Sequence, residues 1–215
     1  MSIRVLFLVN GLGLGNSTRC HAVIERLHSR GVKVDVITAA NGLWYFDGRP
    51  EIDSLNEMEA LTYGQRGGRL SVLKTLSNLR DYRTIMRQNR RVLERVLASI
   101  NPDVVVTDSV YTWGPMRKAR IPIIAINNAD VVRRQFGSFK VKPASIYPQF
   151  YGIELMDYFF HKVGPDAVIS PTIDQRIEEF GKPFIRVGPI VRNGYKPCEY
   201  RGQTGKVAIM LSGSV

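Results

Sequence analysis

Two kinds of hydrophobic pattern alternate along the chain. Short continuous hydrophobic runs are typical of buried parallel strands, and they occupy Arg4–Asn10, Lys33–Ala39, Asp103–Thr107, Ile121–Ile126, Ala167–Ser170 and Phe184–Val187. Segments with hydrophobic residues at helical spacing predict helices at Thr18–Ser29, Leu70–Ile100, Thr112–Ala119, Phe150–Lys162 and Ile173–Glu179. The segment Leu70–Ile100 is expected to form one long helix or a pair of helices. Because parallel strands need helical crossovers, this order predicts an α/β fold with a Rossmann-like, doubly wound parallel sheet.

The pattern changes after Gly188-Pro189. Residues 191–205 are polar, rich in glycine and basic residues and without a period, which is typical of a linker. Another hydrophobic run, Val207–Leu211, precedes the small-residue turn Ser212-Gly213-Ser214. Since a buried strand needs neighbours for its backbone groups, we expect residues 1–190 to form one domain and residues 206–215 to begin a second.

Composition limits the class of protein. The 215 residues are 44% hydrophobic and 23% charged, which is typical of a globular chain and excludes a disordered, collagen-like or coiled-coil one. The two cysteines, Cys20 and Cys198, lie far apart in the sequence, which favours a reducing compartment. No hydrophobic run approaches the roughly 18 residues that cross a bilayer, so we expect a cytoplasmic protein.

The formal net charge of +11 favours an anionic partner. Within the predicted helix Leu70–Ile100, four arginines at steps of seven and four share one face, namely Arg80, Arg87, Arg91 and Arg95. One interpretation is a solvated helix face, and another is peripheral contact with the anionic inner face of the membrane or with an acceptor phosphate. Nucleic acid is not expected, because no helix-turn-helix, zinc knuckle or aromatic platform accompanies the charge.

The segment Asn10–Arg19 connects the first strand to the first helix and has glycine at positions 11, 13 and 15. Glycine allows close approach of a ligand, and free N–H groups at a helix start favour a phosphate or carboxylate. The candidate contacts are Gly13, Leu14, Gly15, Ser17 and Arg19. A nicotinamide-dependent oxidoreductase fits poorly, because the dinucleotide fingerprint needs glycine where this chain has Asn16. A tight turn capped by Ser17, without a ligand, is the other alternative.

Asp108 directly follows one predicted strand, and Asn127 and Asn128 follow the next. Ligands of open parallel sheets bind outside the carboxyl ends of the strands, so these residues are candidate site residues together with the glycine loop. Asp108 can act as a general base on a hydroxyl or orient another base. The alternative is that Asp108 or Ser109 caps the following helix.

Two further features have simpler interpretations. His21, His28 and His161 lack metal-ligand spacing, so we expect surface or structural roles for them and no metal site. The aromatic segment Ile146–Phe160 is expected to lie mostly in the core, and a partly exposed patch that binds a lipid or a partner is the alternative.

Five sequence blocks together resemble the N-terminal domain and domain junction of GT-B glycosyltransferases. They read RVLFLVNGLGLGNSTR, PDVVVTD, IPIIAINN, VGPIVR and VAIMLSGS, and the resemblance covers residues 3 to 215. The chain is most similar to the branch that contains the peptidoglycan lipid-intermediate N-acetylglucosaminyltransferase and related bacterial and archaeal transferases.

The resemblance implies an inverting, metal-independent hexosyltransferase with a nucleotide-diphosphate sugar as co-substrate and no other cofactor. The N-terminal half would bind the hydroxyl acceptor, and the C-terminal half would bind the donor. Residues 191–205 would then be the interdomain linker, and residues 206–215 the first strand and turn of a truncated donor-binding domain. Ser212, Gly213 and Ser214 match the turn near the donor diphosphate. On this basis, the 215-residue chain alone is expected to be inactive.

In many relatives the glycine loop carries a histidine that acts as general base, and Asn16 occupies that position here. An amide cannot accept a proton at neutral pH. Asp108 matches the acidic partner of that histidine, and it would deprotonate the acceptor directly while Asn16 orients the acceptor or a phosphate oxygen. The alternatives are a nucleotide-sugar hydrolase on the same scaffold and a non-catalytic acceptor-binding subunit of a split transferase.

Overall fold

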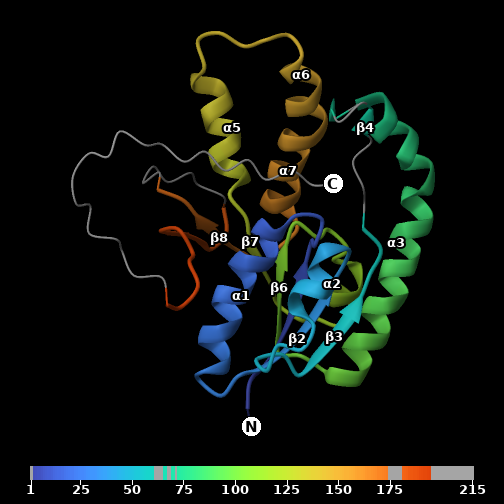
Figure 1. The fold of residues 1–215 in the computed structure, drawn as a ribbon, viewed down its shortest axis with the longest axis vertical. Helices are drawn as coiled ribbons and strands as arrows, with labels where there is room; N and C mark the ends of the chain where they lie inside the picture. Colours follow the sequence, from blue (N-terminus) through green and yellow to red (C-terminus); the bar gives the residue numbers. More distant parts are fainter. Residues whose placement is uncertain (1, 61–64, 67–68, 71, 174–180, 195–215) are drawn as a thin grey trace.

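A parallel β-sheet forms the centre of the molecule (Figure 1). The computed structural model describes residues 2–60, 65–66, 69–70, 72–173 and 181–194. Within them, the sheet has seven strands in the order β3-β2-β1-β6-β7-β8-β9. Their bounds are β1 Arg4–Val9, β2 Lys33–Thr38, β3 Ser54–Glu57, β6 Val104–Asp108, β7 Ile123–Ile126, β8 Ala167–Pro171 and β9 Phe184–Val187. The order reverses between β1 and β6, which makes that point the topological switch of the sheet.

Helices cover the sheet and extend beyond it (Figure 1). They are α1 Leu14–His28, α2 Asn41–Phe46, α3 Val72–Ile100, α4 Gly114–Lys118, α5 Ala129–Ser138, α6 Ile146–Gln149, the π-helical turn η1 Phe150–Glu154, and α7 Leu155–Val163. A short antiparallel pair, β4 Gln65–Arg66 and β5 Arg69–Leu70, precedes α3. In the described residues, no helix combines the length and the hydrophobicity that a membrane crossing requires.

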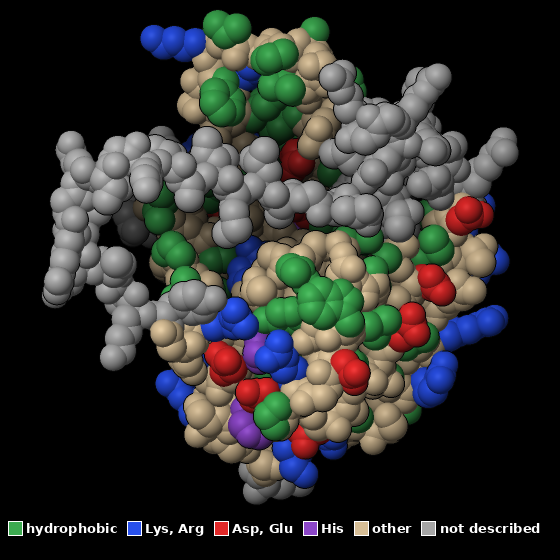
Figure 2. Space-filling view, in the orientation of Figure 1, with side chains coloured by type: hydrophobic (Ala, Val, Ile, Leu, Met, Phe, Trp, Pro, Cys, Tyr) green, Lys and Arg blue, Asp and Glu red, His purple; other side chains and the backbone are tan. Residues whose placement is uncertain are grey.

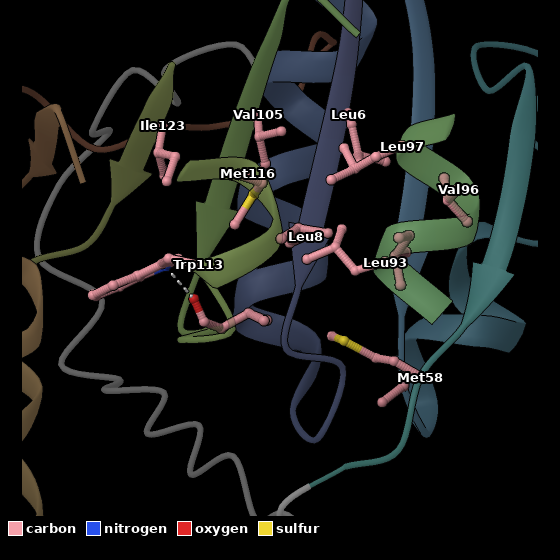
Figure 3. Close-up of a cluster of buried hydrophobic side chains, with 13 residues drawn as sticks. Leu6, Leu8, Met58, Leu93, Val96, Leu97, Val105, Trp113, Met116 and Ile123 are labelled. Atoms are coloured by element: carbon pink, nitrogen blue, oxygen red, sulfur yellow. Dashed lines mark hydrogen bonds between the residues drawn. The ribbon is translucent and has the colours of Figure 1, made fainter. Parts of the chain in front are cut away.

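Side chains from the two faces of the sheet form two hydrophobic clusters, because successive residues of a strand point to opposite faces. On one face, Leu6 and Leu8 of β1 pack with residues of α3 such as Leu93 and Leu97 (Figure 3). The other face packs against α1 and α2, through residues that include Phe7, Ile24 and Phe46. The result is a three-layer α/β/α domain in which β1 is buried on both faces.

The fold class and the six expected strands are confirmed, with strand ends shifted by one or two residues at most. Within the periodic segment 70–100, residues 72–100 form a single helix, α3, whereas Leu70 ends strand β5. The segment 150–162 is helical but begins with the π turn η1. The strand β3 was not expected, because Ser54–Glu57 carries only one large hydrophobic residue. The expected strand at 207–211, and most of the expected linker and of the helix at 173–179, lie outside the described residues. The division into domains therefore stays a prediction.

Helix α1 begins at Leu14, earlier than the sequence pattern suggests. Its N-cap is Gly13, whose backbone is extended, and no side chain caps the helix. The alternative in which Ser17 caps the helix is therefore wrong. Ser17 instead lies within the first turns of α1, fully buried.

Gly11 fixes the path of the loop that leads into α1. A β-carbon at Gly11 would lie 1.9 Å from the carbonyl oxygen of Ala39 and 2.7 Å from the amide nitrogen of Gly42. Both obstacles are backbone atoms, one in the turn after β2 and one in the first turn of α2, so they cannot rotate away. By contrast, a β-carbon at Gly13 or Gly15 would meet nothing within 4 Å. Packing therefore requires glycine at position 11 and leaves open space beside positions 13 and 15.

We predict that Gly11→Ala lowers the free energy of unfolding by about 3 kcal/mol, because the added methyl group overpacks a backbone contact. Gly15→Ala is the matched control, since it adds the same methyl group to an open helical position. That variant should gain up to about 1 kcal/mol from the better helix propensity of alanine. Urea unfolding followed by circular dichroism measures both, and equal stabilities of the two variants would contradict the packing argument.

Candidate functional site

The glycine loop and Asp108 meet at the carboxyl edge of the sheet, at the switch point between β1 and β6. The backbone N–H of Asn10 donates to the carbonyl oxygen of Asp108 at 3.0 Å, and the Asn10 side chain lies 3.4 Å from the carbonyl oxygen of Ser109. Asn127 and Asn128 follow β7, the next strand of the sheet. The structure thus brings the expected candidates to one edge of the sheet.

A bidentate ion pair connects the start of α1 to the end of β6. Nε of Arg19 donates to Oδ2 of Asp108 at 2.9 Å, and Nη2 of Arg19 donates to Oδ1 of Asp108 at 2.8 Å. The same Nη2 lies 3.4 Å from Oδ1 of Asn16. Two parallel N–H···O bonds fix both groups more strictly than a single contact would. Asn16 is therefore coupled to Asp108 through Arg19.

Asp108 is fully buried, and both of its carboxylate oxygens are occupied. Besides Arg19, the thiol of Cys20 lies 3.5 Å from Oδ2 and the hydroxyl of Ser109 lies 3.3 Å from Oδ1. Burial raises the pKa of Asp108, and the charge and hydrogen bonds of Arg19 oppose that rise. Ser109 has a φ of 56°, a left-handed backbone that is unusual for a residue other than glycine. Such strain directly after a buried carboxylate is typical of functional sites.

Asp108 does not cap the following helix, and neither does Ser109. Helix α4 begins at Gly114 after the N-cap Trp113, and no side chain caps it. The capping alternative is therefore wrong, and the hydrogen bonds of Asp108 run to α1 instead.

The loop residues differ in exposure. Leu14 and Gly15 are exposed, Gly13 and Asn16 are partly exposed, and Ser17 is buried with no hydrogen-bond partner for its hydroxyl among the described residues. The open space beside Gly13 and Gly15 adjoins the first turn of α1, where backbone N–H groups are free. This end of the helix can therefore receive an anionic group.

A second polar group surrounds the carboxylate of Asp157, on α7. The hydroxyl of Tyr111 donates to Oδ1 of Asp157, and the side-chain amide of Asn127 donates to Oδ2 at 3.3 Å. Nδ1 of His161 lies 3.1 Å from Oδ1. Burial alone would raise the pKa of Asp157, but these partners, with His161 first among them, hold it below its ordinary value.

His161 is held one helical turn beyond Asp157. Its Nδ1 also lies 2.8 Å from the backbone carbonyl oxygen of Asp157. The side chain is 2% exposed, and its Nε2 has no hydrogen-bond partner among the described residues. The rings of Tyr111 and Trp113 pack near the imidazole, with centroids 5.7 and 6.5 Å away. His161 is therefore a buried histidine with one ring nitrogen satisfied and one free.

A third polar group lies around Asp130, at the start of α5. Oδ1 of Asp130 accepts from the hydroxyl of Ser170 at 2.8 Å. Its Oδ2 accepts from Nη2 of Arg134 at 3.0 Å and from Nη2 of Arg186 at 2.6 Å. These contacts connect α5 to β8 and β9 and extend the polar edge of the sheet. Asn128 is the N-cap of α5, and its side chain makes no capping hydrogen bond.

Sequence reasoning did not single out Tyr111, Asp157 or Arg186 and gave His161 only a surface or structural role. The spacing of Asp157 and His161, four residues apart in a helical segment, was the available signal, since that spacing places two side chains on one helix face. Arg186 contacts Asp130 across 56 residues of sequence, and no local pattern reports such a contact.

The aromatic segment 146–160 is less buried than expected. Phe150 and Tyr158 are buried, but Tyr147, Tyr151, Met156 and Phe159 are between 40% and 57% exposed. Part of the segment lines an open pocket of about 410 Å³ between α5 and the α6–η1 helical segment, with walls from Arg133, Phe136, Gly137, Lys142, Tyr147, Phe150, Tyr151 and Leu155. Hydrophobic side chains gather over this end of the molecule in Figure 2. The alternative of a partly exposed patch therefore describes this surface better than a core does.

One group of described residues has the geometry of a metal site. Ligand atoms of His21, Glu25 and Glu51 lie within 4.8 Å of one another. Burial lowers the pKa of His21, and the positive charges of Arg49 and Arg192 also act on it. These two arginines balance the two carboxylates, so the group is neutral without an ion. His28, on the same helix, is exposed.

The remaining candidates lie on the outer face of α3 or outside the described residues. The side chains of Arg87, Arg91 and Arg95 are exposed along α3, whereas the side chain of Arg80 is not described. Ser212, Gly213 and Ser214 also lie outside the described residues, so their expected place near a diphosphate stays a prediction.

The sheet order, with the glycine loop at the switch point and the polar strand ends, matches one Rossmann-like half of the GT-B fold. A sequence profile of glycosyl transferase family 1 matches residues 3–144, and the chain belongs to that family. No curated protein sequence matches the chain.

Solved structures of glycosyltransferases share the fold at low sequence identity. MurG from Acinetobacter baumannii has 14% identity and a TM-score of 0.51, over 85% of this chain and 44% of its own. A UDP-glucosyltransferase from Polygonum tinctorium, described as capable of glucosylating indoxyl, has 13% identity and a TM-score of 0.57, over 92% of this chain and 55% of its own. UGT73P12 from Glycyrrhiza uralensis, solved with glycyrrhetinic acid 3-O-monoglucuronide, has 13% identity and a TM-score of 0.57, over 88% of this chain and 49% of its own. The chain therefore spans about half the length of these transferases.

We predict that Asp108→Asn lowers the free energy of unfolding by about 3 kcal/mol, because it leaves the Arg19 guanidinium without its buried counter-charge. Glu94→Gln is the matched control, since it breaks the exposed pair in which Nε of Arg90 lies 2.9 Å from Oε1 of Glu94. An exposed pair contributes less than about 1 kcal/mol. Urea unfolding at pH 7 measures the free energy of unfolding of both variants. A loss in Asp108→Asn as small as that in Glu94→Gln would contradict a stabilising role of the Arg19–Asp108 pair.

The lowered pKa of Asp157 predicts a pH dependence of stability. The unfolded chain binds the proton more readily, so the contribution of Asp157 is complete above its ordinary pKa of about 3.9 and is lost as the pH falls through the lower, folded value. Between about pH 5 and pH 3, the wild type should therefore lose more stability than Asp157→Asn. Glu154→Gln should change the slope in the opposite sense, because burial raises the pKa of Glu154. Parallel curves for all three proteins would contradict this electrostatic assignment.

Proposed function

We propose that this chain is the acceptor-binding half of a glycosyltransferase that moves a sugar from a nucleotide-diphosphate sugar to an acceptor hydroxyl. The observation that carries the proposal is the Arg19–Asp108 pair, which holds the glycine loop and the end of β6 together at the switch point of the sheet. Ligands of open α/β sheets bind at that point. The family assignment and the half-length match to complete transferases supply the reaction class.

Four features of the loop and the start of α1 suit a site that receives an acceptor beside a diphosphate. The open space at Gly13 and Gly15 gives a ligand access to the start of α1. Arg19 brings a positive charge to the same place, and Asn16 adds an amide that can donate to a hydroxyl or a phosphate oxygen. Leu14, exposed at 40%, adds an apolar contact. Together with the helix start, Arg19 and Asn16 would stabilise the negative charge that develops on the departing diphosphate.

Asp108 has a positioning role in this proposal. Arg19 occupies both of its carboxylate oxygens and none of its side chain is exposed, so an acceptor hydroxyl would have to displace the guanidinium to reach it. Its negative charge balances Arg19 and holds that side chain at the loop. Asn127 and Asn128, at the end of β7, would line the acceptor side of the crevice.

The aromatic pocket is a place for the rest of an acceptor. Its lining residue Leu155 begins α7, and Asp157 and His161 lie about 3 and 9 Å farther along that helix at 1.5 Å per residue. Aromatic rings with Arg133 and Lys142 beside them suit an apolar acceptor body that carries an anionic group. The exposed arginines of α3 would add peripheral contact with an anionic membrane surface on the cytoplasmic side.

The donor and the leaving diphosphate would be held mainly by a second, donor-binding lobe, with the turn Ser212-Gly213-Ser214 near the diphosphate. Transfer would invert the anomeric centre and need no metal ion. A nucleotide-sugar hydrolase and a non-catalytic acceptor subunit that docks a separate donor-binding subunit remain the alternative functions for this scaffold. They differ in their products, because a hydrolase transfers the sugar to water and an acceptor subunit forms no product.

We predict that the 215-residue chain alone releases no nucleoside diphosphate from a panel of UDP-, GDP- and dTDP-sugars. Joined to a donor-binding lobe, either in one polypeptide read from the gene beyond codon 215 or as a separate subunit, it should transfer sugar to a hydroxyl acceptor. In that assembly Arg19→Ala should lower kcat/KM by about 100-fold, since it removes a charge-assisted contact to the diphosphate. The exposed Arg90→Ala is the control with unchanged rate.

Liquid chromatography with mass spectrometry of the products checks this prediction. Sustained release of nucleoside diphosphate by the chain alone would overturn the half-enzyme proposal. Free sugar without glycosylated acceptor would favour the hydrolase.

A further inference from the structure

We propose that Nε2 of His161 is the general base that deprotonates the acceptor hydroxyl, with Asp157 as its positioning residue. The inference rests on the proposed glycosyl transfer and assigns the proton acceptor that this reaction needs. Asn16 cannot accept a proton, and both carboxylate oxygens of Asp108 are already bonded to Arg19. The edge of the sheet therefore needs a base from another element, and α7 provides one.

The hydrogen bonds at Nδ1 decide which nitrogen of His161 is basic. Two oxygens face Nδ1, the backbone carbonyl of Asp157 at 2.8 Å and its carboxylate at 3.1 Å. A backbone carbonyl can only accept a hydrogen bond, so Nδ1 must carry the hydrogen. In the neutral imidazole, the lone pair then lies on Nε2. This is the nitrogen without a partner among the described residues.

Asp157 is suited to hold His161 in that state. It accepts from Tyr111, Asn127 and His161, three side chains that come from three different segments. Its carboxylate is kept ionised, because these partners outweigh the effect of burial and hold the pKa of Asp157 low. A fixed negative charge at Nδ1 stabilises the imidazolium that forms when Nε2 takes a proton.

His161 also lies close enough to the first polar group to act in the same crevice. Asn127, whose side-chain amide donates to Asp157, follows β7, and β7 pairs with β6, the strand that ends at Asp108. Among the described residues, the titratable groups in contact with the imidazole are Asp157 on α7 and Tyr111 before α4, and the Arg19–Asp108 pair lies at the same edge of the sheet. The ring of Trp113 packs against Gly164 at the end of α7, where a β-carbon would lie 1.5 Å from the indole. This contact fixes the end of α7 beside the site.

The chemical step balances with the donor and acceptor of the proposed reaction. The acceptor oxygen forms a bond to the anomeric carbon while Nε2 of His161 takes the hydroxyl proton. The bond from the anomeric carbon to the diphosphate oxygen breaks, and its electron pair leaves with the nucleoside diphosphate. The imidazolium later returns its proton to solvent. The acceptor hydroxyl would thus supply the hydrogen bond that Nε2 lacks, and the surrounding rings of Tyr111 and Trp113 would exclude water from it.

The tautomer of His161 is the first test, and it needs no substrate. Nitrogen-15 NMR of the whole protein at pH 8 should show hydrogen on Nδ1 and a lone pair on Nε2 of His161. In Asp157→Asn, the population of that tautomer should fall. Hydrogen on Nε2 in the wild type would overturn the assignment of this nitrogen as the base.

The second test measures turnover in the assembly of chain and donor-binding lobe. His161→Gln should lower kcat by about 10² to 10⁴-fold, the range typical of general base catalysis, with a smaller change in KM. The acid limb of the pH profile of kcat/KM should disappear in the same variant. Asp157→Asn should lower kcat less. Added imidazole should restore activity to His161→Gly.

His21→Gln is the matched control, because His21 is also a histidine that is 2% exposed with an unpartnered Nε2 among the described residues. It faces α2 through Tyr45 instead of the crevice, so kcat should stay at the wild-type value. Circular dichroism shows whether each variant is folded. An unchanged pH profile and rate in folded His161→Gln would overturn the proposal while leaving glycosyl transfer intact. Absence of sugar transfer by the wild-type assembly would instead contradict the proposed function. The nitrogen-15 NMR measurement would still show whether Nε2 of His161 carries a lone pair.

Discussion

The bidentate pair between Arg19 and Asp108 is the interaction on which the arrangement of the site depends. It joins the first turns of α1 to the end of β6, two elements that are 89 residues apart in the sequence. A buried carboxylate is costly unless it is paired and hydrogen-bonded, and Arg19, Cys20 and Ser109 together meet that need. Because Arg19 also reaches Asn16, the orientation of the loop is coupled to a charge in the core.

This coupling separates two tasks that a carboxylate at a strand end can perform. A carboxylate that anchors an arginine must keep its oxygens occupied, whereas a base must present a lone pair to the substrate. Asp108 meets the first requirement, and in our proposal Nε2 of His161, which has no partner among the described residues, meets the second. This assignment of roles follows from which atoms have hydrogen-bond partners. The residue types alone suggested Asp108 as the base and a structural role for His161.

The sequence was sufficient for the fold because its signals are local. Continuous runs such as Asp103–Thr107 and the long apolar stripe of α3 report burial directly, and the parallel order follows from their alternation. The strand β3 escaped this reasoning, because its few residues are half-buried at the sheet edge and carry a mixed pattern. The candidate residues at strand ends could also be placed, since the position of a residue after a strand fixes the edge where it lies.

The partners of those residues could not be predicted in the same way. Nothing near Arg19 in the sequence indicates that it binds Asp108 instead of solvent or a ligand. His161 lies in an aromatic segment whose hydrophobicity suggests a core, so its polar neighbours become apparent only when Tyr111 and Asn127 are brought to it. Side-chain pairing across distant segments depends on three-dimensional packing, which local patterns do not encode.

The exposed apolar side chains of the hairpin formed by α5 and α6 have a consequence for the behaviour of the protein in solution. Phe139 and Val141 are 57% and 86% exposed, and a net charge of +11 keeps such surfaces on different molecules apart. At physiological ionic strength, electrostatic repulsion is screened beyond about 8 Å. Adding salt would therefore allow the hairpins of neighbouring molecules to associate. Concentrated samples should remain monodisperse at low ionic strength and self-associate at high ionic strength.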